Sequence, residues 1–139
     1  EVSVGADIIV GFPGETDENF QETYKLIQDG LITKVHAFPF SAHTLGESVP
    51  AGKFPNQVDE SIKKDRMWEI MNISDQIRDD FIERNIGKEF EVLIENVIEQ
   101  DGKIKWKGWT QNYIEADEKT FKITSGEIKR NEIVTGILQ

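Results

Sequence analysis

Two glycines flank a short turn near the start of the chain. Residues 7–20 read DIIVGFPGETDENF, so Gly11 and Gly14 lie on either side of Pro13, directly after an apolar run. Glycine permits a positive φ or a close approach to the backbone, and proline fixes the path between the two glycines. In α/β sheets, turns at the carboxyl ends of strands bind ligands, and bare backbone can hydrogen-bond the edge of an adenine or a ribose. A plain strand-to-helix connection is the alternative, because one glycine pair is weak evidence.

Three titratable side chains near this turn are candidates for contact with a substrate. Glu15 could act as a general base or bind a ribose, although the helix dipole also favours a carboxylate at a helix start. His36 lies within an apolar run, which favours a buried, hydrogen-bonded histidine over a catalytic one. His43 lies in a polar loop and is the better candidate. Because the sequence has no credibly spaced carboxylate pair, serine elbow or P-loop, we expect no self-sufficient set of catalytic residues in this chain.

A second candidate site lies in GKIKWKGWTQNY, residues 102–113. Alternate residues of a strand share a face, which places three lysines on one side and the apolar residues between them on the other. Lysines spaced for phosphates, with aromatic residues nearby on a small barrel, are typical of proteins that bind single-stranded nucleic acids. A solvated strand face above core aromatics is the alternative. The candidate RNA-binding residues are Lys103, Lys105, Lys107, Trp109 and Tyr113, whereas Ile104 and Trp106 are predicted to pack inward.

Composition narrows the classes of function. The 139 residues carry a net charge of −10, and residues 89–139 hold 7 basic and 10 acidic side chains, so any contact with nucleic acid must be a local patch. The absence of cysteine excludes disulfides and thiolate-held zinc or iron–sulfur centres within this chain, and two histidines disfavour an all-histidine site. We therefore expect no metal ligands. No apolar run approaches a membrane span and no secretory signal is present, which predicts a cytoplasmic location.

The first 57 residues predict an α/β arrangement. ADIIVGF is typical of a strand buried on both faces of a parallel sheet. Thr16 is the predicted N-cap of a helix that Gly30 ends, and KVHAFPF follows as a second strand. A strand, a helix and a parallel strand form a βαβ unit, whose loops commonly carry function. Residues 41–57 are predicted to be a loop.

A long helix and then an all-β region follow. Val58 to Asn85 is predicted to be a connecting helix, with one break left open, and its KKDR and RDD segments are expected to be largely solvated. After it, short alternating runs at 88–98, 102–117, 121–125 and 131–139 predict a small antiparallel barrel, with tight turns at QDGK and TSGE. The fold class is therefore α/β followed by all-β. The apolar stripe of the helix comprises Val58, Ile62, Ile70, Ile73, Ile77 and Phe81.

Five stretches of the chain, in this order, closely resemble the C-terminal part of the radical-SAM tRNA methylthiotransferases. They read DIIVGFPGETDENFQET, VHAFPFSAHTLGESVPA, PNQVDESIKKDR, IGKEFEVLIE and GWTQNYIEA, and they cover nearly the whole chain. The resemblance is closer to the branch that thiomethylates threonylcarbamoyladenosine next to the anticodon. It implies a partial radical-SAM (β/α) barrel at residues 1–57, a connecting helix at 58–88 and a small antiparallel TRAM-type β-barrel at 89–139.

The resemblance also implies cofactors and a substrate for the parent enzyme. In that family the barrel binds S-adenosylmethionine and a [4Fe–4S] cluster held by three cysteines, an N-terminal domain holds a second cluster, and the TRAM barrel contacts tRNA. The family commonly has a basic residue where this chain has His43, which departs from the family pattern; His43 is counted among the RNA-binding candidates. By resemblance, the residues that bind S-adenosylmethionine are Ile9, Gly11, Gly14, Glu15 and Phe38.

Without cluster cysteines, the chain is expected to be an inactive piece of a longer protein, and the start at Glu1 agrees with this interpretation. Its expected partners are tRNA and the missing N-terminal part of the same protein. An exposed sheet edge would also favour self-association. Two alternatives stay open: a stand-alone RNA-binding module with a vestigial α/β half, and an acidic protein-interaction domain.

Overall fold

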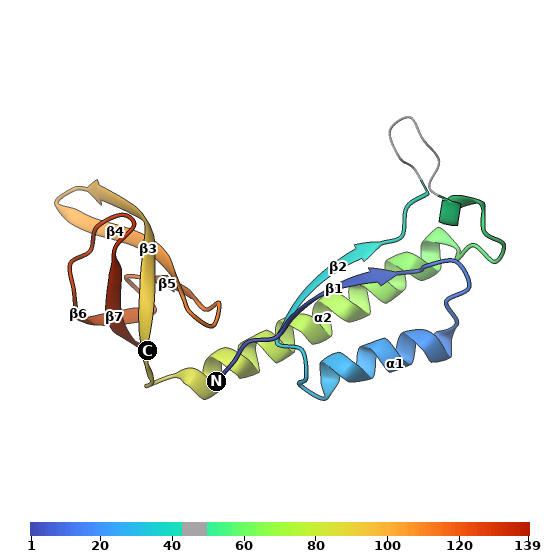
Figure 1. The fold of residues 1–139 in the computed structure, drawn as a ribbon, viewed down its shortest axis with the longest axis horizontal. Helices are drawn as coiled ribbons and strands as arrows, with labels where there is room; N and C mark the ends of the chain where they lie inside the picture. Colours follow the sequence, from blue (N-terminus) through green and yellow to red (C-terminus); the bar gives the residue numbers. More distant parts are fainter. Residues whose placement is uncertain (43–49) are drawn as a thin grey trace. The chain divides into compact units, whose positions relative to one another are not determined.

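The structure, a computed structural model, describes residues 1–42 and 50–139 (Figure 1). These residues divide into two compact units. Residues 4–80 form one, called here the α/β unit, and residues 1–3 with 81–139 form the other, called the β unit. A parallel β-α part is thus followed by an antiparallel sheet, which confirms the predicted fold class.

The α/β unit begins with a strand, a helix and a parallel strand, as predicted. These are β1 (Gly5–Val10), α1 (Asp17–Gln28) and β2 (Lys34–Pro39), and Ile9 of β1 lies opposite Phe38 of β2. One face of the sheet packs against α1 and a second helix, α2 (Glu60–Asn85). The core on that side comprises Val10, Phe20, Ile27, Ile70 and Ile73.

The prediction that the first strand is buried on both faces is wrong. Ile9 is 55% exposed and its register partner Phe38 is 46% exposed. In the described residues the parallel sheet has two strands, and the helices cover only the face that carries Val10. The other face, which carries Ile9 and Phe38, is called the open face below.

Helix α2 runs without a break over 26 residues and ends at Asn85, close to the predicted end. A single turn of 3₁₀ helix at Pro50–Lys53 precedes it. The prediction that the KKDR segment is solvated is wrong for Lys63 and Arg66, each of which is only 5% exposed, whereas Ile62 of the predicted stripe is exposed. The reason is helical spacing: counting back from Ile70 by four and then three residues reaches Arg66 and Lys63, on the same buried face.

The β unit is a five-stranded antiparallel sheet with strand order β5-β4-β3-β7-β6. Gln100 pairs with Lys103, so the predicted hairpin turn at QDGK is confirmed. The predicted single run 102–117 is instead two strands that pair with each other, and the TSGE turn is a longer loop from Gly126 to Glu132. The strands are β3 (Glu89–Gln100), β4 (Lys103–Thr110), β5 (Glu115–Asp117), β6 (Phe121–Ser125) and β7 (Ile133–Leu138).

The core of the β unit includes Phe81, from the last turns of α2, together with inward-facing residues of the sheet. Trp106 is buried as predicted, but Ile104 is exposed because it lies beside the β3–β4 turn, beyond the core. In the described part of the chain no helix is both long and apolar enough to cross a membrane. Whether the sheet is of the TRAM type stays a prediction.

Candidate functional site

The glycine turn after β1 has the backbone conformation that only glycine adopts without strain. Gly11 has φ +76° and Gly14 has φ +86°. The amide of Gly14 donates to the carbonyl of Asn56 (2.8 Å), and the amide of Glu15 donates to the carbonyl of Phe12 (2.9 Å). The turn is therefore a defined loop with its own hydrogen bonds, and it leads directly into α1.

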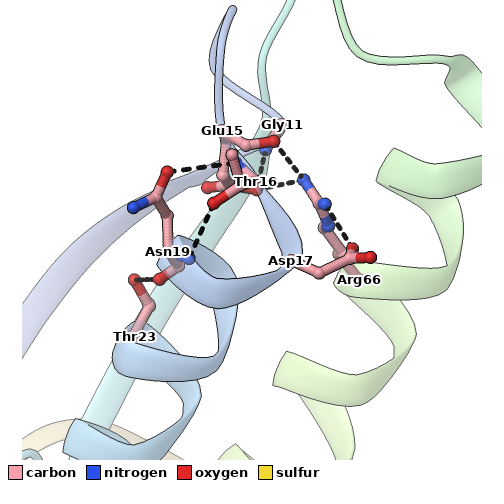
Figure 2. Close-up of polar contacts among 7 residues, drawn as sticks. All are labelled: Gly11, Glu15, Thr16, Asp17, Asn19, Thr23 and Arg66. Carbon is pink, nitrogen blue, oxygen red and sulfur yellow. Dashed lines mark hydrogen bonds and ion pairs between the residues drawn. The ribbon is translucent and has the colours of Figure 1, made fainter.

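Helix α1 begins with a capping box. Thr16 Oγ1 accepts a hydrogen bond from the amide of Asn19, and Asn19 Oδ1 accepts one from the amide of Thr16, both at 3.1 Å (Figure 2). The predicted N-cap at Thr16 is thus confirmed. Two amides that would otherwise lack intrahelical partners are satisfied, which fixes the angle at which the turn enters the helix.

Glu15 links the glycine turn to α2 (Figure 2). Its Oε1 accepts a hydrogen bond from the amide of Gly11 (3.0 Å) and pairs with Nη1 of Arg66 (2.7 Å). The same Nη1 donates to the Glu15 carbonyl (3.2 Å), and Nη2 pairs with Oδ1 of Asp17 (2.7 Å). The side chain of Glu15 is 13% exposed and that of Asp17 is 92% exposed, so the Glu15 pair is the more strongly coupled. These contacts give Glu15 a structural role, and ribose binding by it stays a prediction.

Arg66 is a buried cation that the turn neutralises. Burial alone would lower the pKa of Arg66, but hydrogen bonds to Asp17 and Glu15 outweigh it and hold the pKa above the ordinary value. The guanidinium carbon also lies 5.5 Å from the centroid of the Phe20 ring, which adds a cation–π contact. Arg66 therefore stays charged and holds Glu15 of the turn and Asp17 at the start of α1.

Lys63 contacts the turn from the same helix. A Cβ atom added at Gly11 would overlap the Lys63 stem at Cγ, so glycine is required there for space as well as for φ. The Lys63 ammonium donates to the carbonyl of Phe40 (3.1 Å), just after β2, and pairs with Glu60 (2.9 Å). The burial of Lys63 and Arg66 was not predicted from the sequence, although continuing the spacing of the buried isoleucines of α2 would have found both.

The open face of the β1–β2 sheet brings Ile9 and Phe38 together. They are register partners, so their side chains point to the same side. His36 lies on that face too, with its ring centroid 4.9 Å from that of Phe38 and its Nδ1 3.8 Å from Oδ1 of Asp7. The prediction that His36 is buried is wrong, because its side chain is 77% exposed. An apolar pair beside a histidine and a carboxylate forms a half-exposed surface of the kind that a planar heterocycle can cover.

The lysine strand is β4. Lys103, Lys105 and Lys107 are all exposed, as their alternation predicts, and Lys107 lies 3.8 Å from the carboxylate of Glu115 on β5. Lys105, Lys107 and Lys119 line a hollow on the sheet. Acidic residues line the same hollow. The local field is therefore mixed in sign. The other residues that line the hollow are Asn96, Ile98, Trp106, Asp117 and Glu118.

The two aromatic RNA-binding candidates differ in their surroundings. Trp109 is half-buried, and its Nε1 donates to a carboxylate oxygen of Glu95 (3.1 Å) at the irregularity of β3. Tyr113 is exposed, in the loop between β4 and β5, with φ +62°. His43 lies outside the described residues. Within residues 1–42 and 50–139, no three histidine, cysteine or carboxylate residues are grouped as a metal site would need.

Comparison with known proteins relates the chain to one class of enzyme. A threonylcarbamoyladenosine tRNA methylthiotransferase from Bacillus subtilis is 32% identical over 134 residues, which is 96% of this chain and 29% of the relative. A ribosomal protein uS12 methylthiotransferase from Clostridioides difficile is 37% identical over 94 residues, 68% of this chain and 20% of the relative. The chain is homologous to methylthiotransferases. No protein-family model matches it.

A third relative of this methylthiotransferase homologue is named after a different modified nucleoside. It is a tRNA-2-methylthio-N(6)-dimethylallyladenosine synthase from Alkaliphilus oremlandii, 34% identical over 100 residues, 72% of this chain and 21% of the relative. The chain spans less than a third of the length of each of the three relatives. Similarity alone therefore does not distinguish a tRNA substrate from a ribosomal protein.

The two cofactors implied by the resemblance need different residues in this methylthiotransferase homologue. An iron–sulfur cluster does not fit, because cluster ligands are thiolates and the sequence has no cysteine. For the adenine of S-adenosylmethionine, the open face offers an exposed apolar surface at Ile9 and Phe38, and binding there stays a prediction. The Gly11 amide is already bonded to Glu15, so it is not available as a donor to that adenine. The Gly14 amide is likewise bonded to Asn56, but no atoms lie within 4 Å of the position of an added Cβ, so a ligand can approach Gly14 from that side.

Proposed function

We propose that this chain is the C-terminal portion of a radical-SAM tRNA methylthiotransferase that thiomethylates an adenosine derivative next to the anticodon. The observation that carries the proposal is the 32% identity to a tRNA methylthiotransferase along 96% of this chain. The order of the resembling stretches supports assignment to the C-terminal part, with residues 1–57, 58–88 and 89–139 as the barrel end, connecting helix and TRAM domain. We place the parent enzyme in the cytoplasm.

In this proposal the α/β unit supplies one wall of the S-adenosylmethionine site. Ile9 and Phe38 would cover a face of the adenine, since both project from the open face and are half-exposed. Gly14 would allow the ligand to approach the backbone, and Gly11 with Glu15 would keep the turn in place from behind. When bound, S-adenosylmethionine would supply the radical that the reaction needs. This chain would position the adenosyl group and exclude water from one side of it.

The β unit would contact tRNA through β4. Three exposed lysines on one face can each approach a phosphate, and Trp109 follows on the same face, two residues after Lys107. Tyr113 offers a second exposed ring in the next loop. His43 belongs to the proposed RNA contacts by resemblance alone.

The chain by itself would not catalyse thiomethylation, because the cysteines that hold the clusters must come from the missing N-terminal part. The test supplies the 139-residue chain with iron, sulfide, reductant, S-adenosylmethionine and tRNA under anaerobic conditions. Mass spectrometry of the digested tRNA should show no methylthio-adenosine product, whereas the longer protein from the same gene should form it. Turnover by the short chain, or stoichiometric iron and sulfide bound to it, would contradict the proposal.

A stand-alone RNA-binding module is a second candidate, favoured by the fact that the lysines and both aromatics lie within one compact unit. The gene upstream of the codon for Glu1 separates the two candidates. An in-frame segment that encodes a cysteine triplet supports the enzyme, and a start codon directly before Glu1 supports the module.

The unpaired edges of the parallel sheet suggest what the chain associates with. In the described residues β1 and β2 pair only with each other, so each leaves one edge available for pairing. We expect the rest of the parent protein to cover an edge, and the short chain by itself to associate with another copy. Light scattering at micromolar concentration should show a dimer or larger species, and a monodisperse monomer would count against this.

A further inference from the structure

We propose that Lys63 and Arg66 of α2 are positioning residues that hold the adenosine-binding face of the α/β unit in shape from its covered side. The inference rests on the proposed function, because it assigns these residues to the S-adenosylmethionine site. Neither side chain lies on the open face, and both are 5% exposed. They would act on the ligand only through the backbone that they hold.

The first step is the contact of Arg66 with the turn. Its Nη1 pairs with Glu15 Oε1, and that oxygen also accepts the hydrogen bond from the amide of Gly11. One carboxylate oxygen thus joins α2 to the residue that lies two positions after Ile9. If the guanidinium were removed, Glu15 would be left largely buried without its cation, and its hold on Gly11 would weaken.

The second step is the contact of Lys63 with both strand ends. Its stem fills the space beside Gly11, and its ammonium donates to the carbonyl of Phe40, two positions after Phe38. The amide of Phe40 donates in turn to the carbonyl of Val10 (2.7 Å). Gly11, two positions after Ile9, is therefore held by the Lys63 stem and, through Glu15, by Arg66, whereas Phe40, two positions after Phe38, is held by Lys63.

If Lys63 and Arg66 only filled space in the core, apolar side chains could replace them. Two apolar side chains at these positions would bury as much surface, but they could not hydrogen-bond Glu15 or the Phe40 carbonyl. The cations instead fix the two strand ends that carry Ile9 and Phe38. Loss of either cation should loosen the spacing of those two side chains and so weaken adenosine binding.

The test measures S-adenosylmethionine affinity by calorimetry on the full-length protein after cluster reconstitution. Arg66→Gln and Lys63→Met should each weaken binding about tenfold or more at a temperature where both variants remain folded. Arg66→Lys keeps the charge but can hold only one of the two acidic residues, so its affinity should fall between wild type and Arg66→Gln. Lys64→Gln, an exposed neighbour on the same helix, should stay within about twofold of wild type.

A destabilising variant that does not touch the turn separates positioning from stability. Ile73→Ala removes a core side chain of the same unit and should lower the melting temperature at least as much as Arg66→Gln. It should nevertheless leave S-adenosylmethionine affinity within about twofold. Equal loss of affinity in Ile73→Ala and Arg66→Gln would overturn the positioning role.

A second measurement does not depend on the ligand. Amide exchange of Gly11 in the 139-residue chain, followed by NMR, should be about tenfold faster in Arg66→Gln and unchanged in Lys64→Gln. Unchanged exchange in Arg66→Gln would overturn the hold on the turn whatever the ligand does. If reconstituted wild type fails to bind S-adenosylmethionine, the proposed function and the ligand part of this inference fail, while the exchange result still decides whether Arg66 holds the turn.

Discussion

Two cations of the α/β unit and the three lysines of β4 in the β unit have opposite surroundings. In the α/β unit Lys63 and Arg66 are buried, and their donors are directed at carboxylates and at a backbone carbonyl. In the β unit Lys103, Lys105 and Lys107 project from a strand into solvent. A buried cation must be paired to offset the loss of hydration, so it holds its partners in a fixed geometry. An exposed cation loses little by changing partner, so it remains able to bind a phosphate.

The largest expected effect comes from breaking the buried pair. Arg66→Met should lower the free energy of unfolding by about 3 kcal/mol, because Glu15 is left largely buried without its cation. The pair with Asp17 contributes little, since that carboxylate is exposed. Lys105→Gln should change the free energy of unfolding by less than about 0.5 kcal/mol. Urea denaturation measures both, and similar losses in the two variants would remove the contrast.

The next effect distinguishes the two glycines of the turn. Gly14→Ala should cost about 1 kcal/mol, because a positive φ disfavours alanine but the added Cβ meets open space. Gly11→Ala should cost about 2 kcal/mol or more, because the added Cβ also overlaps the stem of Lys63. The Gly11→Ala/Lys63→Ala double variant should lose less stability than the sum of the single variants. Additive losses would show that Lys63 does not occupy this space in solution.

Substitution of the lysines of β4 should change the affinity for tRNA rather than the stability of the fold. Replacing Lys103, Lys105 and Lys107 together by Gln should weaken binding to tRNA about tenfold at moderate salt, and reduce the slope of log affinity against log salt by about 2. Of the three, Lys107 should contribute least because it lies near Glu115. Filter binding over a salt series measures this, with Lys129→Gln as a control outside β4. Unchanged affinity in the triple variant would mean that the face is only solvated surface.

The smallest expected effect concerns Asp117, a carboxylate that accepts hydrogen bonds from backbone amides. Burial would raise the pKa of Asp117, but hydrogen bonds from Lys119 and Thr120 outweigh it and hold the pKa below the ordinary value. Because the pKa is lower in the folded state, this stabilisation is present above the ordinary value and lost as the pH falls through the folded one. Asp117→Asn should therefore cost about 1 kcal/mol at neutral pH. Thermal melts over a pH series should show the difference shrinking below a pH of about 3.8; a constant difference would contradict the assignment.

Local patterns in the sequence predicted most of the elements. The strand–helix–strand order, the cap at Thr16, the end of α2 and the turn at Gln100–Lys103 depend on residues close together in the chain, and all are found in the structure. Alternation likewise placed the three lysines of β4 on an exposed face. The homology to methylthiotransferases agrees with the family that the ordered stretches indicated. The roles of the site residues stay predictions.

The predictions that were wrong concern residues whose burial depends on parts of the chain distant in sequence. His36 is exposed because helices cover only one face of its sheet, which its apolar neighbours in sequence do not reveal. Ile104 is exposed because the core ends before the hairpin turn. The Glu15–Arg66 pair joins residues 51 positions apart, so no local pattern could show it.

Residue spacing alone determined where the chain forms strands, helices and turns, because these depend on backbone conformation and on side chains a few positions apart. Only the tertiary structure decided which cations are buried and which acidic groups neutralise them. That choice depends on which face of α2 meets the glycine turn. Burial makes pairing of a charge energetically necessary, and burial is a property of the packed molecule rather than of any short segment.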